Sequence, residues 1–206
     1  NTCRTYVKWC NCIMITAFVE KNSVVGEIIE IKDKTELNHM KNSFRLQVGD
    51  SLRIVDGEYE YFTEIIELSK NEMICKIIEK KEDSFSTKVE IHAGIGLLKN
   101  DKMELVIQKL VEVGVSKIIP VQMQRTIVKI NEKKEKWDTI AKEALKQCQA
   151  VKLTEITEPK ALKKIDYSEY DLVLVPYENE VEVKIWEVLK NREKLGKVLF
   201  IVGSEG

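Results

Sequence analysis

The sequence predicts an α/β protein that consists of a small N-terminal β-barrel and a C-terminal α/β domain built on a parallel sheet. Residues 15–81 contain short β-type runs separated by turn residues, which is typical of a closed or half-closed barrel. From residue 89 onward, apolar strands alternate with amphipathic helical segments, and this alternation indicates a parallel sheet covered by helices. Residues 79–88 (EKKEDSFSTK) are charged and lack periodicity, so we expect a linker there and domains at 14–82 and 83–206.

The composition indicates a globular protein. Charged residues make up 33% of the 206 residues and hydrophobic residues 44%, and no apolar run approaches the roughly 18 residues that span a membrane. We therefore expect a soluble protein. The 33 basic and 34 acidic residues give a formal net charge of -1, so any surface that binds nucleic acid must be a local patch.

The cysteine pattern fits neither a disulfide framework nor a metal site. The count of five is odd, and the two histidines, His39 and His92, are far apart in the sequence. Because zinc sites need paired ligand clusters, we expect no bound metal. Residues 1–13 lack both a starting Met and the pattern of a signal peptide, and we expect them to be a non-native or upstream leader that precedes the fold.

The expected barrel strands and the turn between them follow in order along residues 15–81. They are 24–31 (VVGEIIEI), 44–55 (FRLQVGDSLRIV), the hairpin turn at Asp56-Gly57, 60–68 (EYFTEIIEL) and 73–80 (MICKIIEK).

The second domain is expected to contain three helices. The first begins after Asn100, with Asp101 and Glu104 in an acidic capping arrangement, and ends at Gly114, which can adopt the left-handed conformation. The second begins after Asn131 and carries an apolar stripe from Trp137 to Cys148. The third is a weaker pattern at residues 183–189.

Four buried strands are expected in this domain, at residues 89–98, 117–121, 172–176 and 198–202. Open parallel sheets bind ligands beyond the carboxyl ends of their strands. The loops after Leu98, Pro176 and Val202 carry polar or glycine residues (KND, YENE and GSEG), and they are the expected ligand loops.

Several common catalytic motifs are absent from the sequence. Residues 94–99 (GIGLLK) lack the third glycine of a dinucleotide fingerprint and lie within a strand, so we interpret these glycines as sites of close backbone packing. No P-loop and no Gly-x-Ser-x-Gly elbow occurs, and Ser204 has no plausible histidine partner.

Taken together, several segments resemble one family in order and spacing. They are residues 100–129 (NDKMELVIQKLVEVGVSKIIPVQMQRTIVK), 136–149 (KWDTIAKEALKQCQ), 171–180 (DLVLVPYENE) and 199–206 (LFIVGSEG). They resemble the bacterial small-subunit (16S) rRNA uridine-N3 methyltransferases, which belong to the SPOUT class of trefoil-knotted methyltransferases. The N-terminal part resembles that family's PUA-like barrel, in which a His precedes an Arg-x-x-x-Gly-Asp segment, here His39, Arg45, Gly49 and Asp50. The resemblance covers residues 14–206.

The sequence departs from the family pattern at three points. Ser204 stands where relatives favour proline, and Cys148-Gln149-Ala150 replaces a common Ser-x-Arg. Relatives also continue for several tens of residues beyond the glycine loop, through the last helices and the threaded part of the knot. We therefore expect the cofactor pocket to be incomplete in these 206 residues and the piece to be inactive.

The resemblance implies a reaction and a set of site residues. It implies a cytoplasmic, homodimeric enzyme without metal that transfers a methyl group from S-adenosylmethionine to N3 of a uridine in 16S rRNA. Arg125 is the implied catalytic residue, because a guanidinium would stabilise the uracil anion. The implied cofactor residues are Leu174, Pro176, Tyr177, Glu178, Gly203, Ser204, Glu205 and Gly206. The implied RNA-binding residues are Arg45, Arg53, Lys99 and Lys109.

Two alternatives remain open at the level of sequence. One is a non-catalytic RNA-binding protein with a degenerate knot domain, which the departures at Ser204 and Ala150 motivate. The other is a SPOUT methyltransferase that acts on another rRNA or tRNA site.

Overall fold

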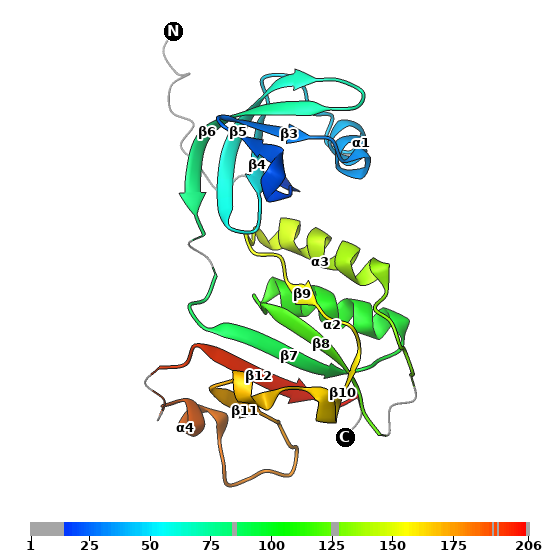
Figure 1. The fold of residues 1–206 in the computed structure, drawn as a ribbon, viewed down its shortest axis with the longest axis vertical. Helices are drawn as coiled ribbons and strands as arrows, with labels where there is room; N and C mark the ends of the chain where they lie inside the picture. The colour runs from blue at the N-terminus through cyan, green and yellow to red at the C-terminus, as the bar shows by residue number, and fades with distance from the viewer. Residues whose placement is uncertain (1–14, 84–85, 125–127, 191, 193, 205–206) are drawn as a thin grey trace. The chain divides into compact units, whose positions relative to one another are not determined.

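The computed structural model describes residues 15–83, 86–124, 128–190, 192 and 194–204. The chain divides into two compact units, Asn1–Glu82 and Asp83–Gly206, each with its own sheet (Figure 1). The first sheet is curled and the second is parallel with helices beside it, so the predicted α/β architecture is confirmed.

Sheet A forms the first unit. Its order is β1 (Thr16–Phe18), β4 (Ser51–Val55), β5 (Tyr59–Leu68), β6 (Met73–Glu82), β3 (Ile28–Ile31) and β2 (Val24–Val25), and the helical turn η1 (Lys21–Ser23) precedes β2. β1 pairs with β4 in parallel and every other neighbouring pair is antiparallel. The β5–β6 ladder shifts register twice, and such bulges bend and twist a strand pair. The curl encloses an apolar core that includes Ile29, Leu52, Ile65 and Met73.

Helix α1 (Lys34–Asn42) was not predicted. Asp33 caps it by accepting a hydrogen bond from the Glu36 backbone N–H at 2.8 Å, and Leu37 and Met40 bury one face. The residues that follow were predicted to begin a strand, but β4 starts only at Ser51. Residues 43–50 instead form a connection, in which Arg45 has a left-handed φ of 53°.

The predicted Asp56-Gly57 turn between β4 and β5 is confirmed. Gly57 has a φ of +92°, and the Asp56 carboxylate accepts hydrogen bonds from the backbone N–H groups of Glu58 and Tyr59 and from the Tyr61 hydroxyl, at 2.8–2.9 Å. Burial alone would raise the pKa of Asp56, but these hydrogen bonds outweigh it and hold the pKa below its usual value.

Sheet B forms the second unit. Its order is β10 (Lys160–Ala161), β8 (Lys117–Gln122), β7 (Glu90–Gly96), β12 (Lys197–Val202) and β11 (Leu172–Leu174), and β9 (Glu155–Ile156) also pairs with β8. Every pair is parallel. The last strand, β12, therefore lies between β7 and β11 instead of at an edge (Figure 1).

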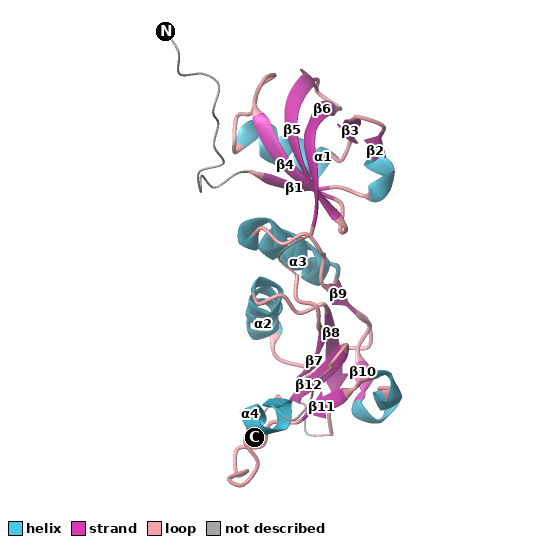
Figure 2. Ribbon diagram, turned by 90° about the vertical axis from the view of Figure 1, so that its left-hand side faces the viewer, coloured by secondary structure: helices cyan, strands magenta, loops and turns pink. Residues whose placement is uncertain are grey.

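Helices α2 (Asn100–Glu112) and α3 (Glu135–Cys148) pack against each other beside sheet B (Figure 2). Gly114 ends α2 with a φ of +81° as predicted, but no side chain caps its N-terminus. Helix α3 starts three residues later than expected and ends at Cys148, and the next residue, Gln149, has a left-handed φ of 58°. The third predicted helix is the short α4 (Ile185–Lys190).

Another face of sheet B is covered by a segment without long helices. It contains the helical turns η2 (Leu162–Lys164) and η3 (Tyr167–Glu169), and Ile165 and Tyr170 pack against Ile119, Val121, Leu199 and Ile201. None of the helices that the structure describes is both long and apolar enough to cross a membrane.

Candidate functional site

Three neighbouring strands of sheet B end at the same edge. Leu174 at the end of β11 is in register with Phe200 of β12, and Val202 at the end of β12 is in register with Ile95 of β7. Because the strands are parallel, the chain segments that follow β11, β12 and β7 leave from adjacent positions. These segments contain the YENE, GSEG and KND residues that the sequence places in ligand loops.

The backbone after β12 lies directly against β7. An ideal Cβ built on Gly96 would fall 2.5 Å from the backbone N of Ser204 and 2.9 Å from the carbonyl carbon of Gly203. A Cβ on Gly94 would meet the Ile201 side chain at 3.2 Å. The interpretation as a site of close backbone packing is confirmed for Gly96, whose missing side chain leaves room for residues 203–204, whereas Gly94 faces only side-chain atoms.

The predicted cofactor residues surround this edge as far as the structure describes them. Leu174 is half-buried, Pro176, Tyr177, Glu178 and Gly203 are exposed, and Ser204 is intermediate; Glu205 and Gly206 lie outside the described residues. Between described residues, the backbone N–H groups of Gly203 and Ser204 make no hydrogen bond. Backbone donors next to apolar strand ends suit the polar edge of a nucleoside-like cofactor.

Apolar side chains are exposed along the segment that follows β11. Val175, Tyr177, Val181, Val183, Ile185 and Trp186 each expose between 57% and 81% of their surface. A run of exposed apolar side chains of this kind marks a surface that contacts a ligand or another chain.

The predicted catalytic residue, Arg125, lies outside the described residues. It follows Gln122, the last residue of β8, by three positions in the sequence, and β8 is the other neighbour of β7. The end of β8 therefore belongs to the same edge as the three strand ends above.

The two predicted RNA-binding lysines of this unit are exposed and lie on or beside α2. Lys99 is the residue before the helix. The Lys109 ammonium is 2.7 Å from the Glu112 carboxylate, a pair with the i,i+3 spacing of a solvated helix face.

The two predicted RNA-binding arginines of the barrel differ in their exposure to solvent. Arg45 is exposed, whereas Arg53 is 3% exposed, and its Nε donates to a Glu60 carboxylate oxygen at 2.9 Å. Arg53 also approaches the Thr16 hydroxyl at 3.4 Å. A guanidinium that is almost fully buried and paired with Glu60 cannot reach RNA in this arrangement, so we assign Arg53 to a buried ion pair between β4 and β5 and leave it out of the RNA surface.

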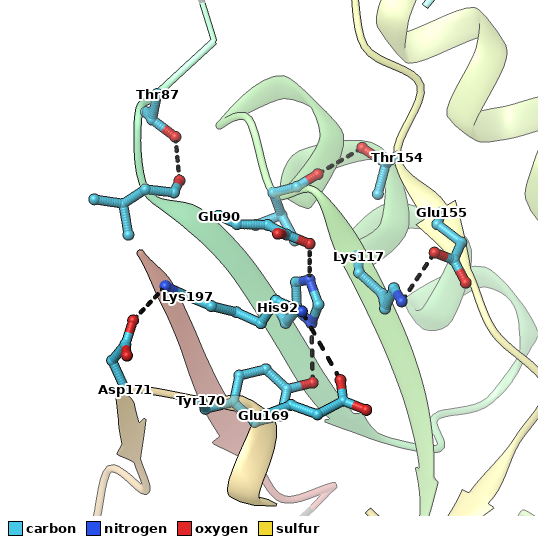
Figure 3. A network of polar contacts seen from close by, with 12 residues as sticks. Thr87, Glu90, His92, Lys117, Thr154, Glu155, Glu169, Tyr170, Asp171 and Lys197 are labelled. Carbon is cyan, nitrogen blue, oxygen red and sulfur yellow. Dashed lines mark hydrogen bonds and ion pairs between the residues drawn. The ribbon is translucent and has the colours of Figure 1, made fainter. Parts of the chain in front are cut away.

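A polar cluster around the buried His92 lies at the opposite, amino end of sheet B (Figure 3). His92 is fully buried; its Nε2 is 2.6 Å from the Glu90 carboxylate and its Nδ1 is 2.9 Å from the Tyr170 hydroxyl. The hydrogen bond with His92 lowers the pKa of Glu90. Because both ring nitrogens are engaged and the cluster is at the wrong end of the strands for a ligand, we interpret it as structural.

A groove of about 450 Å³ lies between α2 and α3, and sequence reasoning missed it. It is lined by Asp101, Glu104, Leu105, Gln108, Ile140, Glu143, Ala144 and Gln147. Three of these residues are acids, which repel a phosphate backbone, so the groove is not a candidate RNA site. In the part of the chain described, no three His, Cys, Asp or Glu side chains are grouped as metal ligands.

Two family models match the chain. One is described as an RNA methyltransferase domain and matches residues 85–206, and the other is described as an RNA methyltransferase PUA domain and matches residues 31–78.

Two curated relatives with the same name are similar to the chain. The chain is 28% identical over 183 residues to the Bacillus subtilis (strain 168) protein "Ribosomal RNA small subunit methyltransferase E", covering 83% of this chain and 72% of that protein. A protein of the same name from Buchnera aphidicola (subspecies Schizaphis graminum) is 28% identical over 207 residues, covering 94% of this chain and 78% of the relative.

Solved structures have the same fold. A putative methyltransferase from Legionella pneumophila in complex with S-adenosylmethionine superposes with a TM-score of 0.78 at 25% identity, covering 94% of this chain and 81% of that one. A ribosomal RNA small subunit methyltransferase E from Neisseria gonorrhoeae gives a TM-score of 0.79 at 21% identity. The match covers 92% of this chain and 79% of the Neisseria chain.

Proposed function

Because this chain belongs to the RNA methyltransferase family, we propose that it transfers a methyl group from S-adenosylmethionine to small-subunit rRNA. The names of the curated relatives support the substrate, and the cofactor in the Legionella structure supports the methyl donor. Within the molecule, the adjacent ends of β7, β12 and β11 support a ligand site at that edge of sheet B.

We propose that the acceptor is N3 of a uridine. N3 lies on the Watson–Crick edge, so the target base must be unpaired or turned out of its stack before it reacts. Loss of the N3 proton leaves an anionic uracil, and we assign its stabilisation to the Arg125 guanidinium. Lys99 and Lys109 would contact phosphates and so position the RNA.

The cofactor side is assigned to two segments. Leu174, Pro176, Tyr177 and Glu178 follow one strand, and Gly203 to Gly206 follow its neighbour. Bound S-adenosylmethionine would supply a methyl group already activated on sulfonium. The protein therefore has to hold and orient the two reactants, and backbone N–H groups at Gly203 and Ser204 would do part of this.

We further propose that the enzyme acts in the cytoplasm as a homodimer. The exposed apolar side chains between Val175 and Trp186 support a second copy as the partner that covers them. In the barrel, exposed Arg45 would contact the rRNA.

The single observation that carries the assignment is the match of residues 85–206 to an RNA methyltransferase domain, and the adjacency of the three strand ends supports the place of the site. The assignment is tested by mass spectrometry of 16S rRNA from a strain that lacks the gene. We expect N3-methyluridine to be lost and to return with the wild-type gene, but not with an Arg125→Ala variant. An unchanged uridine pattern would exclude the proposed site on the rRNA.

Cofactor binding separates the enzyme from a non-catalytic RNA-binding protein. Calorimetric titration of the full-length protein with S-adenosylmethionine should give saturable binding. If the protein binds rRNA but no S-adenosylmethionine, then the non-catalytic alternative is correct.

A further inference from the structure

Two aromatic rings meet on the surface of the barrel just after α1. The centroids of the His39 and Phe44 rings are 4.9 Å apart, and the rings are nearly perpendicular at 72°. Both residues are exposed, and Phe44 leaves 44% of its surface in solvent. A large apolar ring on the outside of a small domain is uncommon unless it contacts something.

The local backbone places Phe44 outside the core. Leu46 is buried, and its N–H donates to the Met40 carbonyl at 3.3 Å. Arg45 joins Phe44 to this anchored residue with a left-handed φ of 53°, a conformation that a non-glycine residue adopts only when its surroundings impose it. The turn therefore presents the Phe44 ring and the Arg45 side chain together at the surface.

We propose that the His39–Phe44 pair is a stacking site for an unpaired RNA base, and that Arg45 contacts the adjacent phosphate. The inference rests on the proposed function and names one contact that the barrel makes with rRNA. Proteins read single-stranded RNA by stacking splayed bases on aromatic side chains, while arginine and lysine hold the backbone.

Arg45, which directly follows Phe44 and is exposed, favours RNA as the occupant. Of the acids near these rings in sequence, Asp33 caps α1, Asp50 accepts a hydrogen bond from the Gln47 backbone at 2.7 Å, and Glu36 lies one turn before His39 on α1. Two rings are also far too small for a stable protein interface, which buries about 800 Å² on each partner, but they match the size of one base.

Binding of small-subunit rRNA to the wild-type protein and to Phe44→Ala tests the site. Stacking on an aromatic residue predicts that Phe44→Ala binds about 5- to 100-fold more weakly, and that Phe44→Trp retains affinity because it keeps a ring. Val48→Ala is the matched control, since Val48 is a 60% exposed apolar residue of the same connection without a ring, and its affinity should not change. Phe44→Ala should keep the wild-type unfolding transition because the ring is outside the core.

A second measurement identifies the contact directly. Photocrosslinking to small-subunit rRNA substituted with 4-thiouridine, followed by peptide mass spectrometry, should give a crosslink at His39 or Phe44. The stacking site would be overturned if Phe44→Ala bound rRNA with wild-type affinity. It would also be overturned if Phe44→Ala kept its rRNA affinity and changed only its sedimentation coefficient, since Phe44 would then contact another protein chain. These outcomes leave the proposed function intact, whereas a wild-type protein that neither binds nor modifies small-subunit rRNA would refute both.

Discussion

Replacement of Arg53 by methionine should strongly destabilise the barrel. The side chains of Arg53 and Glu60 are only 4% and 6% exposed, and their charged groups are 2.9 Å apart. Methionine matches much of the arginine volume, so the main change is that the Glu60 carboxylate stays buried without its cation. Breaking a buried pair in this way destabilises a protein by about 3–5 kcal/mol.

Hydrogen exchange measures this effect on the intact chain. Since about 1.4 kcal/mol corresponds to a tenfold change in an equilibrium constant, the protection of amides in β4 and β5 should fall by about two to four powers of ten. The double variant Arg53→Met/Glu60→Leu should recover most of the protection, because it removes both charges.

Two controls define what would refute the reasoning. Lys21→Met breaks an ion pair with Glu58 in which both side chains are well exposed, and it should leave protection nearly unchanged. Wild-type protection in Arg53→Met would show that the buried pair is not important for the barrel. A folded Arg53→Met protein with weakened rRNA affinity would show that Arg53 does contact RNA.

Three further predictions follow from the core and the candidate site. Because the pKa of Asp56 is lowered in the folded protein, its contribution to stability is complete above about pH 4 and is lost as the pH falls through the pKa of the folded state. The urea midpoint should therefore change less between about pH 5 and pH 3 in Asp56→Asn than in the wild type. An equal change in both proteins would contradict this prediction. Burial raises the pKa of the Cys75 thiol to about 11, so iodoacetamide at about pH 8 should label Cys75 only in denaturant, and labelling of the native protein would refute its burial. Gly96→Ala should destabilise the second unit by about 1–3 kcal/mol and weaken calorimetric binding of S-adenosylmethionine, because its Cβ would displace Ser204. Gly94→Ala should have a smaller effect on stability and on cofactor binding, because its Cβ meets only side-chain atoms. Equal cofactor affinities in the wild type, Gly96→Ala and Gly94→Ala would contradict the role of Gly96.

The central strands of sheet B were predictable because they are largely buried. Segments such as β7, β8 and β12 are continuous apolar runs, and α2 and α3 carry clear helical periodicity. β9 and β10 were missed because two residues are too few to show any period.

The connection around α1 was misread for a physical reason. The alternation in FRLQV fits a strand, but the left-handed residues Arg45 and Gly49 turn the chain there. Helix α1 is short and mostly polar, and its only clear signal was Asp33 followed by Glu36 at the spacing of a capping arrangement.

The candidate site could be predicted only in part. Strand ends with polar loops were visible in the sequence, but the order of sheet B depends on long-range pairing that no local pattern contains. The burial of Arg53 likewise depends on Glu60 across a hairpin, so its sequence context alone could not separate an internal ion pair from an RNA contact.

The position of β12 also bears on how the protein folds. Sheet A includes the β4–β5 hairpin, which can form early because its partners are close in the sequence, whereas Lys197 of β12 pairs with Glu90 of β7. The entropy of closing so large a loop makes this pairing slow, and β11, which pairs with β12, can join the sheet only after β12 has paired with β7. Since Gly203 and Ser204 directly follow β12, we expect the ability to hold a cofactor to appear in the slowest refolding phase, after the barrel is already formed.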